Sequence, residues 1–287
     1  MIKVETMETR ASSLTKTLRL LRVGMHSAEG LAVASAVFPL VSVPRRQALQ
    51  QRWSRRLVSM LGVKLETYGA ARTDGLLVAN HISWLDVFVI SAIFPATFVC
   101  KSEVRAWPAI GSLCVKTGTI FIERGRSAAA RITNEAVVAH LHQGRQIAVF
   151  PEGTTTDGSC MEPFRAAMLQ TALDSGAVVQ PLALRYLNAE GLRVTDTAYI
   201  GDTSFWESLC RIASSQGLVA RIETLEPIAT KLPEAGLDVL TRRHLAELAQ
   251  RRILAALNLE HATELRTTAP PAKNAVSPAP TFATGPA

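Results

Sequence analysis

The sequence predicts an α/β domain, a layered domain with a mixed, largely parallel sheet flanked by helices, preceded by an N-terminal membrane-docking helical pair. Two observations support this fold class. From Val63 onward, short runs of β-forming residues alternate with helical stretches, a pattern typical of strands and helices packed in layers. Before that point, a long uncharged segment lies between two groups of basic residues, which is typical of a segment that lies at a membrane surface.

Residues 1–58 are expected to form the helical pair. A basic amphipathic helix is predicted over 14–25, and the apolar residues near one of its faces are Leu14, Leu18, Leu21 and Met25. Fourteen uncharged residues, 30–43, then precede five arginines within 45–56. Because a transmembrane helix needs roughly 20 apolar residues and Pro39 interrupts the run, we expect two helices that dip into one leaflet, with arginines at the headgroups. A single span and a buried pair of core helices remain alternatives.

The predicted α/β domain covers residues 59–262. Its predicted strands are 63–69, 75–80, 96–101, 118–124, 146–153, 178–184, 192–201 and 218–228. Its predicted helices are 84–94, 126–144, 164–177 and 240–258. Parallel sheets of this kind carry their sites at strand ends. Residues 263–287 are rich in proline and alanine and cannot build a core, so we expect a disordered tail.

The composition favours an anionic partner. The chain has 31 Lys and Arg against 24 Asp and Glu, a formal net charge of +7, and 48% apolar residues. Nucleic acid, an acidic membrane surface and a phosphorylated substrate all fit such a charge. Aromatic residues make up only 6% of the chain and do not alternate with basic ones, so we expect no nucleic acid partner. The four cysteines form no C-x-x-C pair, which indicates neither a zinc site nor a disulfide framework.

The segment NHISWLD, Asn80 to Asp86, follows a predicted strand. Ser83 is a good helix N-cap, and Asp86, three residues later, would complete a capping box. His81 precedes the helix, so its ring can turn back to the Asp86 carboxylate; within one regular helix the two would lie about 140° apart. A carboxylate on one ring nitrogen fixes the tautomer and raises the basicity of the other. The segment is a capped helix start, a catalytic His–Asp pair, or both.

Two further strand ends carry polar residues. In GTIFIERG a strand is followed by Arg124, whose guanidinium suits a phosphate, and by Gly125, which allows close approach of a ligand; a surface ion pair is the alternative. In VFPEGTTTDG a strand is followed by Glu152, Gly153 and three threonines. This second segment is either a polar turn or a phosphate loop, although the Lys-Ser/Thr ending of nucleotide-binding loops is missing.

The segment VVQPLAL, 178–184, contains Pro181 within an apolar strand. Proline would break a central ladder of hydrogen bonds, so it predicts an edge strand, a bulge or a special turn.

Together, in this order, these four segments resemble the sequence blocks of the glycerolipid acyltransferase family, which includes the bacterial 1-acylglycerol-3-phosphate acyltransferases. NHISWLD is similar to the first block, FIERG to the second, FPEGT to the third and VVQPLAL to the fourth. The resemblance covers roughly residues 60–200. The basic, hydrophobic N-terminus is similar to the membrane-docking helices of the family.

The resemblance implies transfer of a fatty acyl group from acyl-CoA or acyl-carrier protein, without a cofactor, to the hydroxyl of a lysophospholipid, with lysophosphatidic acid as the first choice. His81 would be the base and Asp86 its orienting carboxylate. It further implies a location at the inner (cytoplasmic) membrane, with the catalytic domain on the cytoplasmic face. The implied substrate-binding residues are Lys101 and Arg124 for the phosphate, Gly125, Glu152, Gly153 and Thr154 around the acceptor, and Pro181 for the fold around the acyl donor.

One departure concerns the acceptor. Many members continue the third block as EGTRS, whereas this chain has Thr155 and Thr156 in place of the arginine and serine. The acceptor is then a phosphorylated lipid held through Arg124 and Lys101, or another lyso-lipid such as a lyso-amino-acid (ornithine-type) lipid.

Two other classes of protein compete with an acyltransferase. A lipid hydrolase could use the same His–Asp pair to activate water, but no G-x-S-x-G nucleophile elbow is present. A non-catalytic membrane lipid-binding or scaffold protein would use the amphipathic N-terminus and would not need His81 as a base. His140 and His142 resemble a metal pair, but on one helix they would point to opposite sides, so we expect no metal site.

Overall fold

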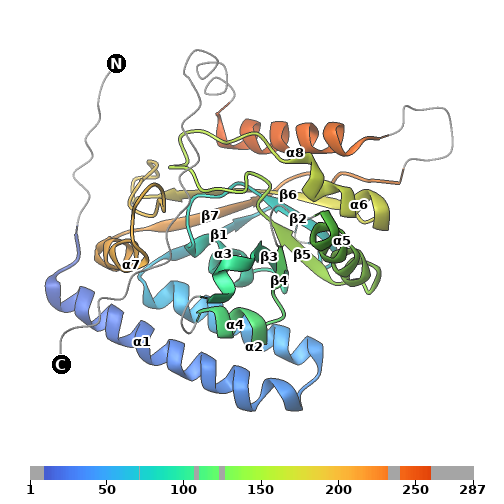
Figure 1. Cartoon of the computed structure of the whole chain (residues 1–287). Coiled ribbons are helices and arrows are strands. Elements are labelled where there is room, and N and C mark those ends of the chain that lie inside the picture. The colour runs from blue at the N-terminus through green and yellow to red at the C-terminus, as the bar shows by residue number, and fades with distance from the viewer. Residues whose placement is uncertain (1–9, 71, 107–109, 123–126, 232–239, 260–287) are drawn as a thin grey trace.

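The structure is a computed structural model that describes residues 10–70, 72–106, 110–122, 127–231 and 240–259. In these ranges a seven-stranded sheet lies between two layers of helices (Figure 1), as the sequence predicts. The strands are β1 (Lys64–Tyr68), β2 (Gly75–Ala79), β3 (Thr97–Lys101), β4 (Ile120–Ile122), β5 (Gln146–Val149), β6 (Val179–Leu187) and β7 (Val219–Thr224). The helices after residue 80 are α3 (Leu85–Ser91), α4 (Ile110–Lys116), α5 (Ser127–His142), α6 (Gln170–Ser175), α7 (Phe205–Ser214) and α8 (Arg242–Leu257).

The strand order in the sheet is β1-β7-β6-β2-β5-β3-β4. Strands β6, β2, β5, β3 and β4 are parallel to one another, whereas β7 is antiparallel to β6 and parallel to β1. The sheet is therefore mixed and largely parallel. The carboxyl ends of five strands meet at one edge, where ligand sites form in sheets of this kind.

Both faces of the sheet are buried, as expected for parallel strands covered by helices on each side. On β2, Leu77 and Ala79 belong to the core shared with α3 and α7, and Leu76 and Val78 belong to the core shared with α5, α6 and α8. This alternation follows from the two-residue repeat of a strand.

Residues 192–201 do not form the predicted strand. Their backbone instead bonds to three separate places: Val194 N donates to Tyr186 O, Tyr199 N donates to Ile82 O, and Tyr199 O accepts from the Thr155 hydroxyl. The β-branched residues of this segment suggested a strand, but it meets the sheet in an isolated antiparallel bridge between Arg193 and Leu187 of β6, and Tyr199 then bonds to the loop that follows β2. Helices α4 and α7 and the 3₁₀-helix Ser102–Ala106 were not predicted, and the predicted helix 164–177 consists of a 3₁₀-helix, Ala166–Leu169, followed by α6.

The prediction of an edge strand for Pro181 is wrong, because β6 lies in the middle of the sheet. Pro181 is tolerated there because the β6–β7 ladder is interrupted beside it: between the pairs Leu182–Thr224 and Val179–Ile228, two residues of β6 face three on the other chain segment. Pro181 O accepts from Leu225 N at 3.0 Å. The missing N–H of a proline points to the same side as its carbonyl, so it falls at this bulge rather than in a regular ladder, in agreement with the alternative prediction.

The N-terminal helices are α1 (Ser13–Ala36) and α2 (Val43–Met60), joined through a 3₁₀-helix, Phe38–Leu40, that contains Pro39. They form an antiparallel pair beneath the α3 side of the sheet (Figure 1). His26 of α1 and Trp53 of α2 join the two helices. The Trp53 indole N–H donates to His26 O at 2.9 Å, and the two rings stack with centroids 4.9 Å apart. The predicted helical pair is therefore present, with its break at Pro39.

Both helices are attached to the α/β domain. On α2, Gln47, Gln51 and Arg55 lie one turn apart and donate to the carbonyls of Pro95, Ile93 and Ala92, which follow α3. On α1, the Arg19 guanidinium donates to Ala213 O and Ser215 O at the end of α7. A cation at these carbonyls complements the negative end of the helix dipole. Arg19 is thus turned inward, whereas Arg22 is exposed.

No helix within the described ranges is long and apolar enough to cross a membrane. The predicted tail, 263–287, lies outside the described residues, and the predicted domain boundaries stay predictions.

Two glycines of α1 give opposite stability predictions. A Cβ on Gly30 would lie 2.4 Å from the Trp53 indole nitrogen, whereas a Cβ on Gly24 would meet no atom within 4 Å. Gly30→Ala should therefore lower the free energy of unfolding by about 1–3 kcal/mol, because the hydrogen-bonded indole must move. Gly24→Ala should raise it by about 0.5–1 kcal/mol, because alanine favours a helix. Urea unfolding of the full chain measures both, and equal effects of the two variants would contradict the packing of α1 on α2.

Candidate active site

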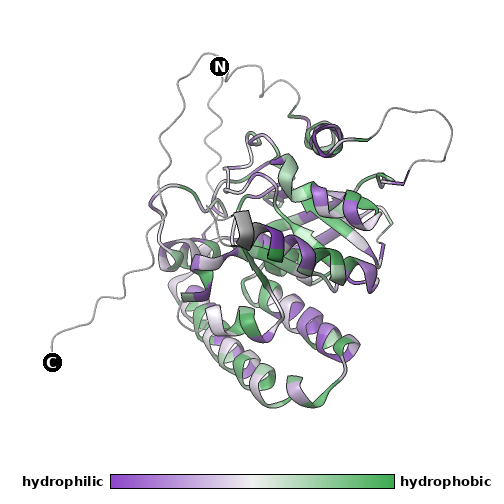
Figure 2. Cartoon of the chain, turned by 45° about the vertical axis from the view of Figure 1, so that its right-hand side comes forward, coloured by the Kyte–Doolittle hydropathy of each residue, from purple (hydrophilic) through white to green (hydrophobic). Residues whose placement is uncertain are grey.

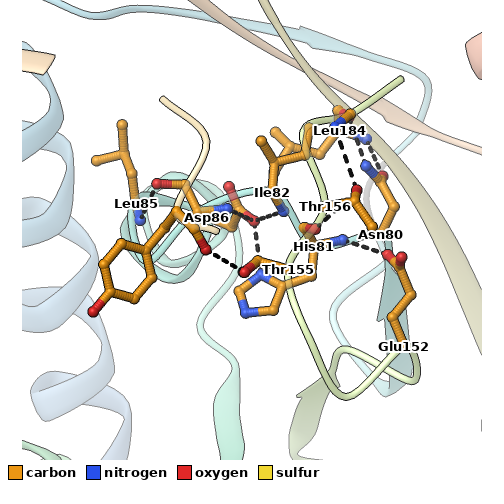
Figure 3. Close-up of polar contacts among 12 residues, drawn as sticks. Asn80, His81, Ile82, Leu85, Asp86, Glu152, Thr155, Thr156 and Leu184 are labelled. Atoms are coloured by element: carbon orange, nitrogen blue, oxygen red, sulfur yellow. Dashed lines mark hydrogen bonds and ion pairs between the residues drawn. The ribbon is translucent and has the colours of Figure 1, made fainter. Parts of the chain in front are cut away.

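The predicted site residues gather at the carboxyl edge of the parallel strands. His81 follows β2, Glu152 follows β5, and Lys101 ends β3. Figure 3 shows His81 between the Asp86 carboxylate on one side and the loop that carries Glu152 and Thr156 on the other. The topology of the sheet thus brings together segments about 70 residues apart in the chain.

His81 and Asp86 are in contact. The Nδ1 atom of His81 lies 2.8 Å from Oδ2 of Asp86. The same oxygen accepts from the backbone N–H groups of Ile82 at 2.7 Å and Ser83 at 2.9 Å. The loop-then-helix geometry predicted from the sequence therefore allows the histidine to turn back onto the first turn of α3.

The predicted capping box is only half present. Asp86 does reach back to Ser83 N. However, α3 begins at Leu85, its N-cap is Trp84 and has no side-chain cap bond, and the Ser83 hydroxyl accepts from Leu85 N at 3.3 Å. Ser83 is thus not the N-cap. The Asp86 carboxylate holds the loop instead, because its Oδ2 gathers three donors that precede the helix.

The second oxygen of Asp86 is held by Tyr186 of β6. The Tyr186 hydroxyl donates to Oδ1 at 2.7 Å, and both side chains are buried. Burial, and next the charge of Asp86, raise the pKa of the Tyr186 phenol well above its usual value, so it remains a donor. Asp86 therefore accepts hydrogen bonds on both oxygens and is fixed in one rotamer.

The strand–loop junction before His81 is fixed by Asn80. Its side-chain amide donates to Leu184 O at 2.9 Å, and its side-chain oxygen accepts from Leu184 N at 2.8 Å. This reciprocal pair continues the β2–β6 pairing past the last strand residue, Ala79. The position from which the His81 ring turns is thereby set by the sheet.

The His81 ring is held on one face and open at one nitrogen. It stacks on Phe150, with centroids 3.9 Å apart and planes at 11°. Because Nδ1 donates to the carboxylate, Nε2 carries the lone pair, and within the described chain it makes no hydrogen bond. The His81 side chain is 19% exposed, whereas that of Asp86 is fully buried. This arrangement is that of a general base with its orienting carboxylate.

Glu152 braces the backbone of the site. Its Oε1 accepts from His81 N at 2.7 Å and its Oε2 from Glu162 N at 2.8 Å. Burial raises the pKa of the Glu152 carboxyl to about 8, against the opposing effect of these two N–H donors. The role predicted for it, shaping the acceptor pocket, stays a prediction. The structure adds that it ties the loop after β5 to the loop after β2.

The threonines after Gly153 divide into two kinds. Thr156 N donates to His81 O at 2.9 Å, and the Thr155 hydroxyl donates to Tyr199 O. These two therefore hold the loop against the base. Thr154 is exposed.

The remaining predicted residues lie in different places. Lys101 is exposed at the end of β3, on the same edge as His81. Pro181 lies within β6 and pairs with Val78, two residues before Asn80. Arg124 and Gly125 lie outside the described residues. In the described ranges no group of three His, Cys, Asp or Glu side chains lies where a metal could bind.

Sequence reasoning did not assign roles to Tyr186, Asn80 or Phe150. Tyr186 carries a usable signal, because a tyrosine in a largely apolar strand needs a partner for its hydroxyl. Asn80 is buried at a strand end, and a buried side-chain amide likewise needs hydrogen-bond partners. Phe150 precedes the Glu152 segment and gives no polar signal.

A cavity of about 460 Å³ lies elsewhere. It is lined by residues of the start of α2 together with residues that precede or begin β2, β3 and β5, including Thr73, Pro95 and Gln146. These lie at the amino ends of the parallel strands, so the cavity is at the edge opposite to His81 and is separate from the candidate site.

Comparisons with known proteins identify the family of the chain. A family model described as Acyltransferase matches residues 62–185. The lyso-ornithine lipid O-acyltransferase of Pseudomonas aeruginosa is 37% identical over 243 residues, which cover 84% of this chain and 91% of that protein. The 1-acyl-sn-glycerol-3-phosphate acyltransferase of Neisseria meningitidis serogroup B is 37% identical over 172 residues, which cover 59% of this chain and 67% of that protein.

A solved structure, that of the 1-acyl-sn-glycerophosphate (LPA) acyltransferase PlsC from Thermotoga maritima, shares the fold. Its TM-score is 0.57 at 16% identity, with 88% of this chain and 100% of that chain covered. The matched region contains His81, Asp86, Glu152 and Pro181. From the family match and from a relative 37% identical that is covered over 91% of its length, the chain belongs to the acyltransferase family that its sequence blocks resemble.

Proposed function

We propose that this acyltransferase moves a fatty acyl group from a thioester, acyl-CoA or acyl-carrier protein, to the free hydroxyl of a lyso-lipid. The observation that carries the proposal is the His81–Asp86 pair, with Nδ1 bonded to a buried carboxylate and Nε2 open. An alcohol attacks a thioester poorly unless a base removes its proton as the new bond forms. The open nitrogen of His81 supplies that base.

The reaction needs no acyl-enzyme intermediate. His81 Nε2 takes the proton of the acceptor hydroxyl while that oxygen attacks the thioester carbonyl carbon. The tetrahedral intermediate then collapses with loss of the thiolate, which takes the proton back from His81. The buried Asp86 carboxylate stabilises the imidazolium between these two steps, and Phe150 keeps the ring in the plane in which Nδ1 faces Asp86.

Lysophosphatidic acid is the first candidate acceptor, and a lyso-ornithine lipid is the second. The net charge of +7 and a relative named for 1-acyl-sn-glycerol-3-phosphate support the first. Two observations favour the second: Thr155 stands where an arginine is common, and the lyso-ornithine lipid O-acyltransferase relative matches over more of this chain, 84% against 59%.

We further propose that α1 docks this enzyme on the cytoplasmic face of the inner membrane. Five large apolar side chains are exposed on α1 and the following turn: Leu14 (70%), Leu18 (42%), Leu21 (58%), Met25 (66%) and Leu40 (84%). Those on α1 follow a helical spacing, so they share one face. Figure 2 shows hydrophobic and hydrophilic residues alternating along the N-terminal helices. An apolar stripe flanked by exposed arginines suits an anionic lipid surface.

The proposed reaction is tested by thiol release from acyl-CoA and from acyl-carrier protein, using purified protein and both lyso-lipids. An acceptor should stimulate release, and His81→Ala should lower the stimulated rate at least about 100-fold, since the base is lost. His142→Ala, on α5, is the matched histidine control and should keep the rate. Unchanged stimulated release by His81→Ala would contradict the mechanism.

Tyr186→Phe should shift the pH dependence of kcat/KM. Without the phenol, Oδ1 of Asp86 loses its donor and the carboxylate stabilises the protonated ring more strongly. The acidic limb of the profile should therefore move to higher pH, by up to about one unit. Tyr199→Phe is the control, because the contact of Tyr199 with Thr155 is through its backbone carbonyl. A lower rate with an unmoved limb would mean that Tyr186 serves packing alone.

Membrane docking is tested with vesicles of phosphatidylethanolamine and phosphatidylglycerol. The double variant Leu18→Glu, Leu21→Glu should bind them at least about tenfold more weakly, because two apolar side chains that would enter the lipid become charges. The double variant Ile132→Glu, Leu192→Glu changes two equally exposed apolar residues away from α1 and should bind like the wild type. Equal loss of binding in both variants would contradict docking through α1.

A further inference from the structure

The loop between β5 and α6 forms one wall of the active site and closes on itself. Arg165 N donates to Pro151 O at 3.0 Å, which joins the two ends of the loop. Within it, Glu152 and Thr156 bond to the His81 backbone at 2.7 and 2.9 Å. Groups that the loop leaves facing solvent therefore lie next to the catalytic base.

The Arg165 guanidinium lies against Gly153 of this loop. A Cβ on Gly153 would be 2.9 Å from both Cζ and Nε of Arg165. Gly153 also has a φ of +68°, which glycine adopts without strain. Gly153 therefore has two roles. It permits the turn after Glu152, and it leaves room for the planar guanidinium of Arg165 to pack against the backbone.

The charge of Arg165 is not neutralised within the protein. In the part of the chain that the structure describes, its guanidinium has neither a hydrogen bond nor an ion pair, and the side chain is exposed. Other arginines do find carboxylates, for example Arg221 with Glu66 at 2.9 Å. The carboxyl that directly precedes Gly153, that of Glu152, accepts from two backbone N–H groups, and burial raises its pKa to about 8.

Backbone donors lie beside this cation. The N–H groups of Thr154 and Thr155, which follow the turn at Gly153, donate to no acceptor within the described ranges, and Thr154 is exposed. Successive free N–H groups after such a turn bind anions. An arginine adds a planar pair of donors that matches the two oxygens of a phosphate or a carboxylate.

We propose that Arg165, with the N–H groups of Thr154 and Thr155, binds the anionic group of the acceptor headgroup. This inference rests on the proposed function and assigns the anion site of the acceptor. Arg165 would take the place of the arginine that the third sequence block lacks. The Thr155 hydroxyl donates to Tyr199 O, so residue 155 stabilises the loop. The cation would then come from Arg165, at the far end of the same loop. A lysophosphatidate phosphate and an ornithine carboxylate offer the same oxygens.

The experiment measures binding and turnover separately with short-chain acceptors below their micelle concentrations. The probes are a hexanoyl lysophosphatidic acid, a short-chain lyso-ornithine lipid and, as an uncharged comparison, hexanoylglycerol. Arg165→Ala should weaken binding of whichever anionic lipid the wild type prefers by about 10- to 100-fold, the value of charged hydrogen bonds. It should raise KM for that acceptor and leave KM for the thioester donor within about twofold.

Two variants serve as controls. Arg251→Ala, on α8, removes an exposed arginine without a side-chain hydrogen bond in the described chain and should bind as the wild type does. Arg165→Lys keeps the charge but not the planar pair of donors, so it should recover only part of the affinity.

The outcomes are distinguishable. Equal binding of the anionic acceptors by Arg165→Ala and the wild type, an equal loss for hexanoylglycerol, or a change confined to the donor KM would each overturn the assignment of Arg165. Binding that is lost in Arg165→Ala supports the assignment even where no acceptor stimulates thiol release, and in that case only the proposed reaction fails.

Discussion

The Asp86 carboxylate is the group on which the site depends. It is fully buried and accepts from the His81 ring, from the N–H groups of Ile82 and Ser83, and from the Tyr186 hydroxyl. A buried carboxylate without donors would cost several kcal/mol, so each of these contacts is needed to keep it in place. Together they join the loop after β2, the start of α3 and the far end of β6. The histidine is oriented because its partner cannot move.

The length of β6 makes this possible. Strand β2 ends at Ala79, paired with Leu182, whereas β6 continues to Leu187. The extension carries Leu184 to the Asn80 side chain and, two residues later on the same face, Tyr186 to Asp86. A central strand that outruns its neighbour thus supplies two positions of the site. The bulge beside Pro181 accommodates in that strand a residue that has no N–H to donate to a regular ladder.

The sequence predicted the parts of this structure that depend on local pattern. The alternation of strands and helices, the break at Pro39 and the turn of His81 onto Asp86 follow from periodicity, proline chemistry and the geometry of a helix start. What it could not supply depends on contacts distant in the chain. Residues 192–201 have strand-like composition, but their hydrogen bonds go to Tyr186, Ile82 and Thr155. The pairing of Tyr186 with Asp86 spans 100 residues, and the strand order that creates it leaves no mark on local periodicity. For the same reason the sequence could not decide between an edge strand, a bulge and a special turn for Pro181.

The attachment of α2 to α3 gives the proposed membrane surface a mechanical link to the base. Gln47, Gln51 and Arg55 donate to three carbonyls at the end of α3, the helix whose first turn carries Asp86. At the other end of the pair, Trp53 fixes α1 to α2 through the His26 carbonyl. The exposed leucines of α1 are therefore held in a constant position relative to His81. If α1 lies in the lipid surface, the depth of the base is set by these bonds. A lyso-lipid whose chain stays in the bilayer can then present only hydroxyls near its headgroup to Nε2, and the headgroup is the group that we propose Arg165, on the neighbouring loop, to bind.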